Sequence, residues 1–221
     1  MNDARTRAGR LALLCLVVAA VAARVTGAPV PLPAQAGSEG PRYESAAALP
    51  APAPIRFDEA IAAGDQQIVR GVIAEARPEA RRLVELVAGL VTITVGRPGA
   101  RVAGSAGPTA DGYSVVLDLG GVYRASGMRG VRRLVLHELA HVVDHALVPS
   151  ALEEELDAAT PAGFGCDGNV SGGCAAREER FAESFAKWAT GDIGHDLYLG
   201  YRVPPPASLS DWGRPLAVIG R

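Results

Sequence analysis

Two histidines four residues apart, His137 and His141, constrain the fold of this chain more than any other feature of its sequence. They belong to the segment HELAHVVDH, which holds three of the four histidines in the chain. On an α-helix this spacing places both imidazoles on one face, where they can bind a single zinc ion. Glu138 lies beside them, placed to act as a general base toward a water molecule. We therefore predict a helix over residues 131–146 with a metal-binding face and a core face.

A second predicted helix, over residues 176–190, carries the third ligand, because a catalytic zinc site commonly has three protein ligands and one open position. Its aromatic residues form one stripe of a helical wheel, which we expect to be buried. Four polar residues form another stripe, which we expect to face solvent: Arg177, Arg180, Ser184 and Lys187. Glu179 and Glu183 share the remaining sector with a small alanine, where a metal can approach closely. We predict Glu179 as the ligand.

Other carboxylates near this site have predicted supporting roles. Glu183 lies one turn after Glu179, where it can accept a hydrogen bond from the second ring nitrogen of a ligating histidine and orient the ring. Asp144 either does the same for His141 or caps its own helix. Glu178, Glu183 and Asp144 stay open as alternative third ligands.

The remainder of the folded part predicts a mixture of helices and strands, an α+β fold. Helices are expected at about residues 59–76, 83–90 and 150–159, and strands at residues 91–95 and 113–119. In the second strand apolar residues alternate with polar ones, and the face carrying Asp118 is expected to be solvated, as in an edge strand. Glycine and proline over residues 96–112 predict a loop or an irregular hairpin. The three glutamates at 153–155, in the predicted helix over residues 150–159, are expected to face solvent. No helix or strand is predicted after Gly191.

The amino-terminal segment predicts an export signal. Three arginines precede an apolar run over residues 11–23, which is too short to span a bilayer at about 1.5 Å per residue. We expect cleavage after Ala23 or near Ala28, so that residues 1–23 are the signal peptide. Residues 24–54 form a linker rich in proline and alanine, and residues 55–221 form one domain. The protein is then secreted, or anchored by the uncleaved segment, with no membrane contact after cleavage.

Net charge indicates which class of partner to expect, and cysteine content indicates whether a disulfide forms. The formal net charge is −2, and no run of Lys or Arg is interleaved with aromatic residues. We therefore expect no nucleic-acid partner, and a monomer. After the signal the chain has two cysteines, Cys166 and Cys174, in the loop CDGNVSGGC. An even pair in an exported chain predicts a disulfide, and two free thiols are the alternative.

The segments HELAHVVD and EERFAESFA together resemble the zinc metallopeptidases of the gluzincin group, most of all the family of the anthrax lethal factor catalytic domain. The resemblance implies a zincin-like domain, with a small sheet whose edge strand packs on the HExxH helix and a helical carboxyl-terminal part. It places His137, His141 and Glu179 as ligands of one Zn²⁺ per chain. It also implies Glu138 as the catalytic base, Glu183 as the supporting acid, and a peptide or protein as the substrate.

One departure from this family leaves a second function open. The family has a tyrosine before the glutamate helix that stabilises the oxyanion, whereas residues 169–176 contain none. The alternative donors are Tyr198, Tyr201 and His195. Without a donor, the alternative function is a secreted zinc-binding or adhesion module of zincin fold that has lost turnover.

Overall fold

One small sheet and a larger set of helices make up the part of the chain that the computed structural model describes, so the predicted α+β class is confirmed. The described residues are 49, 51–99, 102–161, 175–194, 197 and 203–220. They all belong to the larger of the two compact units of the chain, Gly37–Arg221. In chain order the elements are β1 (Arg56–Phe57), α2 (Ala63–Glu75), α3 (Pro78–Val87), η2 (Ala88–Leu90), β2 (Val91–Val95), β3 (Gly104–Thr109), β4 (Gly112–Leu117), α4 (Leu119–Leu147), α5 (Ser150–Ala158), α6 (Arg177–Thr190), α7 (Leu209–Gly213) and η4 (Leu216–Val218).

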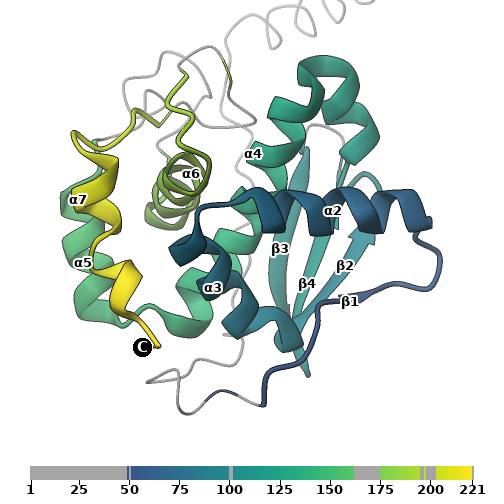
Figure 1. Ribbon diagram of the computed structural model, residues 1–221, viewed down its shortest axis with the longest axis horizontal. Coiled ribbons are helices and arrows are strands. Elements are labelled where there is room, and N and C mark those ends of the chain that lie inside the picture. The colour runs from purple at the N-terminus through teal and green to yellow at the C-terminus, as the bar shows by residue number, and fades with distance from the viewer. Residues whose placement is uncertain are drawn as a thin grey trace, which may run out of the picture. The chain divides into compact units, whose positions relative to one another are not determined.

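The four strands form one sheet in the order β1-β2-β4-β3. β1, β2 and β4 run parallel, while β3 pairs antiparallel with β4 in a hairpin. The parallel step from β1 to β2 passes through α2 and α3, and α2 crosses in front of the sheet in Figure 1. Long crossovers of this kind are what parallel neighbours require.

The prediction that residues 113–119 form an edge strand is wrong. β4 lies inside the sheet, hydrogen-bonded to β2 on one side and to β3 on the other. β1 is the outer strand at one edge of the sheet, and the outer strand next to β4, at the opposite edge, is β3, which lies within the glycine- and proline-rich segment predicted as a loop or an irregular hairpin. That composition is unfavourable for strands. The predicted alternation in β4 itself is confirmed, since Tyr113, Val115 and Leu117 are buried and Ser114 is only half-buried.

The part of α4 that carries the motif begins after Gly127, close to the predicted start near residue 131, and a separate piece that Asp118 caps precedes it. The Asp118 carboxylate accepts a hydrogen bond from the backbone N–H of Gly121, at 2.8 Å. The first piece of α4 begins at Leu119, and Asp118 has a structural role rather than a solvated one. Gly127 divides α4 into two pieces with φ 62° and ψ −163°, a backbone conformation that favours glycine.

Helix α6 lies at the centre of the helical part, in contact with α3, α4, α5 and α7, and Figure 1 shows it end-on among them. It ends as predicted at Gly191, which has a φ of 69°. Every residue from Phe181 to Ala189 is buried, so the prediction that Ser184 and Lys187 face solvent is wrong. A helical wheel cannot show that several neighbouring elements cover one helix on all sides.

The carboxyl-terminal residues form part of that cover, although no element was predicted there. Trp212 of α7 is buried, its ring centroid lies 5.7 Å from that of Phe181, and its Nε1 donates a hydrogen bond to Thr160.

Near the start of the domain, helix α2 begins at Ala63 instead of Glu59, because Asp58 accepts a hydrogen bond from the N–H of Ala60 in a preceding turn. Within the described ranges, no helix has the length and apolar character needed to cross a membrane.

Candidate metal centre

The two imidazoles of the HELAH motif lie next to each other on the side of α4 that faces α6. The ring centroids of His137 and His141 are 5.0 Å apart and the rings are nearly perpendicular. Their side chains are 15% and 11% exposed, which leaves a narrow access from solvent. The residues between and around them, including Leu136, Leu139 and Val143, are buried in the core and fix the helix. The predicted division of α4 into a ligand face and a core face is therefore present.

Glu179 of α6 brings its carboxylate to both histidines. Its Oε2 lies 3.2 Å from Nε2 of His137, and its Oε1 lies 3.7 Å from Nε2 of His141. Each of the three residues offers a donor atom within 4.8 Å of the others, so the group can hold a metal ion. Zinc bonds of about 2.0–2.2 Å place the ligand atoms of a tetrahedral site about 3.3–3.5 Å apart, close to the separations seen here.

Glu183, one turn later on α6, contacts the opposite nitrogen of the first histidine. Its Oε2 lies 3.2 Å from Nδ1 of His137, and its side chain is 4% exposed. This contact turns Nε2 of His137 toward Glu179, as an outer carboxylate does for a metal-binding histidine. Among the described residues, the group of potential metal donors does not include Glu183, Glu178 or Asp144.

Two cations that were not predicted hold Glu183 in place. Lys187 Nζ lies 3.2 Å from Glu183 Oε1 and donates a second hydrogen bond to the carbonyl of Val203, at 2.6 Å. Arg133 Nη1 lies 3.8 Å from the same carboxylate oxygen. The spacing of Glu183 and Lys187 by one helical turn is a signal in the sequence for the first pair. Nothing in the sequence indicates the second.

These contacts set the protonation of the group in the protein chain alone. Burial lowers the pKa of His137, but hydrogen bonds with Glu179 and Glu183 outweigh burial and raise that pKa well above its ordinary value. Burial is the largest influence on both carboxyls and raises their pKa, but the hydrogen bond with His137 and the charges of His137 and the other nearby basic groups together outweigh it and bring each pKa to about 2. Burial, together with the charge of His137, lowers the pKa of His141 to about 3. His141 is thus neutral, the form that binds a metal.

Glu138, next to His137 on α4, lies against strand β3 of the sheet. It is 5% exposed, and a Cβ atom on Gly104 of β3 would overlap its carboxylate. Burial raises the pKa of Glu138 to about 7, opposed by His137 and reinforced by Glu179. A carboxyl with a pKa near neutrality can accept and return a proton at the working pH. The need for glycine at position 104 was not predicted.

Asp144 lies on α4 in a different group of buried charges. It is completely buried, and Nη1 of Arg177 lies 3.9 Å from its Oδ1 and 3.1 Å from Oε2 of Glu153. Glu153 is 8% exposed, so the prediction that all three glutamates of α5 face solvent is wrong. The group ties α5 to the start of α6 and to the end of the motif helix.

Several predicted site residues lie outside the described residues. These are both cysteines of the predicted disulfide, Cys166 and Cys174, and all three alternative oxyanion donors, His195, Tyr198 and Tyr201. Their roles stay predictions, as does the signal peptide over residues 1–23.

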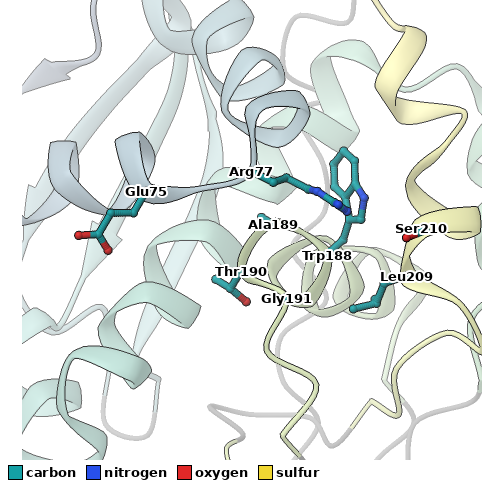
Figure 2. A pocket seen from close by; sticks show the side chains of 8 residues that line it. All are labelled: Glu75, Arg77, Trp188, Ala189, Thr190, Gly191, Leu209 and Ser210. Carbon is teal, nitrogen blue, oxygen red and sulfur yellow. The ribbon is translucent and has the colours of Figure 1, made fainter.

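A cavity of about 420 Å³ lies apart from these residues, where the junction of α2 and α3 meets α7 and the end of α6. Figure 2 shows the Arg77 side chain extending toward Trp188, and its guanidinium carbon lies 5.0 Å from the centroid of that ring. The cavity is lined by Glu75, Arg77, Trp188, Ala189, Thr190, Gly191, Leu209 and Ser210. None of these belongs to the metal-binding group, so this cavity does not belong to the metal centre.

Comparisons with known proteins do not assign the chain to a family. No protein-family model, no curated protein and no solved structure matches it.

Proposed function

We propose that this protein is a secreted, zinc-dependent endopeptidase with a zincin-like domain. The observation that carries the proposal is the approach of Glu179 to both His137 and His141, from a helix about forty residues further along the chain. A solvated helix face would not require a distant carboxylate to converge on the same two nitrogens. The antiparallel outer strand β3, in contact with the motif helix α4, supports the zincin-like part of the proposal.

The donor set fits zinc better than the other common metals. Two imidazoles and one carboxylate are a recurrent ligand set of catalytic zinc, whereas magnesium and calcium prefer oxygen ligands alone. Zinc binding would release the extra proton that the raised pKa of His137 keeps on that ring in the metal-free chain. Three protein ligands leave one coordination position for water or substrate. The partial exposure of Glu179, at 28%, provides an approach to that position.

The chemistry assigned to the chain's own residues is proton transfer and orientation. A zinc ion supplies Lewis-acid chemistry, polarising a carbonyl oxygen and lowering the pKa of a water to about 7. Glu138 would take a proton from the attacking water and return it to the leaving amine nitrogen. Glu183 holds His137 in the required orientation, and Lys187 holds Glu183.

The substrate class follows from the position of the outer strand. β3 is the last strand of the sheet, and its Gly104 lies against Glu138. An extended peptide that hydrogen-bonds to the free edge of β3 would pass next to the general base, with main-chain contacts that tolerate many sequences. β4 cannot take this role, because it lies inside the sheet. A monomer that cleaves peptide or protein outside the cell is the resulting proposal.

Hydrolysis by the purified chain tests this function. The chain with residues 1–23 removed is expected to bind one zinc ion and to cleave casein, and a chelator abolishes the cleavage. Glu138→Gln should retain zinc and lose activity by about 10²–10⁴-fold, the usual contribution of a general base. Glu178→Gln removes a carboxylate on α6 outside the donor group and serves as the matched control.

Two outcomes contradict the proposal in different ways. Zinc binding with no hydrolysis by the wild-type chain would support the alternative, a zinc-binding or adhesion module without turnover. Cleavage that is unchanged in Glu138→Gln would remove Glu138 from its role.

A further inference from the structure

Strand β3 turns its backbone groups alternately toward β4 and toward the edge of the sheet. In an antiparallel pair every second residue exchanges hydrogen bonds with its neighbour, and the residues between direct their N–H and C=O groups to the other side. The N–H of Asp118 donates to the carbonyl of Ala103, at 2.8 Å, in the register that β3 and β4 continue. Counting in steps of two from Ala103, the residues of β3 that bond to β4 are Ser105, Gly107 and Thr109.

The other residues of β3 direct their backbone groups to the edge of the sheet, and these are Gly104, Ala106 and Pro108. Among the described residues, no strand pairs with β3 on this side, and no backbone hydrogen bond from another segment reaches these three residues (Figure 1). Gly104 is buried against Glu138, whereas Ala106 and Pro108 are half-buried. The strand is therefore more open further from Glu138.

Pro108 differs from the other two residues because proline has no backbone N–H. Gly104 and Ala106 each offer one donor and one acceptor to an extended peptide, whereas Pro108 offers an acceptor alone. Since Pro108 faces the edge, its missing donor costs no hydrogen bond with β4, and such positions are where sheets tolerate proline. A peptide that pairs with β3 would meet this missing donor about 13 Å from Gly104, at about 3.3 Å per residue.

We propose that Pro108 is a specificity-determining residue that ends main-chain recognition of the substrate. Full pairing is then limited to the part of the peptide opposite Gly104 and Ala106, about three to five substrate residues, depending on its direction. Residues of the peptide beyond this stretch add little affinity. The inference rests on the proposed function, which brings a peptide to β3, and adds a limit to the length that the site recognises.

Peptide binding to the full mature chain tests the proposal. Affinity is measured in the zinc-loaded Glu138→Gln chain with fluorescent casein-derived peptides of about four to ten residues, long enough to extend past Pro108. We expect affinity to rise with length and then to level off. Pro108→Ala supplies the missing N–H and should strengthen binding of the longest peptides by about three- to tenfold, without affecting the shortest. Gly107→Ala is the control, because its backbone bonds to β4 and its added Cβ meets no atom within 4 Å.

The reciprocal change, Ala106→Pro, removes a donor from the edge without removing a bond to β4. It should weaken binding of every peptide that reaches this position by about three- to tenfold. This variant can be read even if Pro108→Ala self-associates through its new edge donor.

Hydrolysis of casein by the wild-type chain separates failure of this inference from failure of the proposed function. If the wild type cleaves casein but Pro108→Ala and Ala106→Pro bind peptides as Gly107→Ala does, the inference is overturned and the peptidase function stands. If the wild type does not cleave but binding follows both proline changes, the peptidase function fails and the limit set by Pro108 stands. Absence of peptide binding at every length overturns the inference.

Discussion

Two successive turns of α6, the open end at Glu179 and the buried end one turn further along at Glu183, carry the same kind of side chain in very different surroundings. At its start, Glu179 is 28% exposed and faces the two histidines. One turn later, Glu183 is 4% exposed and contacts His137, Lys187 and Arg133. Both carboxyls have a pKa of about 2, although only the first lies where a ligand can reach it from solvent. The two glutamates therefore differ in their exposure to solvent and not in their charge. Exposure is what distinguishes the proposed metal ligand, Glu179, from the glutamate that orients the histidine, Glu183.

In the proposed function the open end takes part in the chemistry, whereas the buried end supports it. Ion pairs removed from water contribute little net stability, but losing one partner leaves an uncompensated buried charge. A half-exposed carboxylate can be replaced at a smaller cost to folding. Changes at the two ends of α6 should therefore affect different properties of the protein.

The largest expected effect on stability comes from the buried end. Lys187→Met should lower the free energy of unfolding by about 3 kcal/mol or more, because Glu183 loses one of its two closest cations in the protein interior. Arg180→Met, on the same helix, breaks a less buried pair with Asp157 and should cost less. Urea unfolding of the chelator-treated protein measures both. Equal costs for the two variants would show that burial does not distinguish the ends of the helix.

The second prediction concerns the pH dependence of the chelator-treated protein. The pKa of Glu138 is raised to about 7 in the folded chain, from 4.5 when unfolded, so the folded state binds more protons between these values. Stability from the protonated carboxyl is fully present below pH 4.5 and is lost as the pH rises to about 7, by up to about 3 kcal/mol. In Glu138→Gln this decline should be absent. A decline of the same size in that variant would assign it to another group.

The third prediction sharpens the comparison at the open end. Glu179→Gln should weaken zinc binding by more than about 100-fold, beyond the usual effect of losing an outer partner. Its effect on unfolding of the chelator-treated protein should be smaller than that of Lys187→Met. Glu178→Gln should leave zinc affinity unchanged. Equal zinc affinity of the two glutamine variants, measured by competition with a chromogenic chelator, would exclude Glu179 as the ligand.

The smallest expected effect lies on the sheet side of the site. Gly104→Ala should retain zinc but lower the rate of peptide hydrolysis by about 100-fold. The added Cβ would overlap the Glu138 carboxylate and displace it from the position in which it can take a proton. Gly107→Ala is the matched control on the same strand, where a Cβ meets no atom within 4 Å. Peptide hydrolysis by the two variants, measured with zinc content, checks this. Turnover that falls equally in both would indicate a general effect on β3.

Short-range patterns in the sequence were enough to place both motif helices and the strand over residues 91–95. The helical wheel put Glu179 and Glu183 in one sector, and both carboxylates do lie against His137. These results depend on periods of two and 3.6 residues, which the local sequence contains.

Features that depend on distant neighbours could not be predicted in this way. Lys187 is buried because it reaches the carbonyl of Val203, sixteen residues away in the chain. The position of β4 inside the sheet depends on β3, whose glycine and proline content resembles a loop. Gly104 is required only because Glu138 approaches it from another element. Each of these is a tertiary contact without a local sequence signal.

A crystal structure of the zinc-loaded protein, with data collected at the zinc absorption edge, tests the central claim most directly. The account predicts one zinc ion about 2.0–2.2 Å from Nε2 of His137, Nε2 of His141 and a carboxylate oxygen of Glu179. An anomalous peak elsewhere, or none at these three side chains at full zinc occupancy, would contradict it.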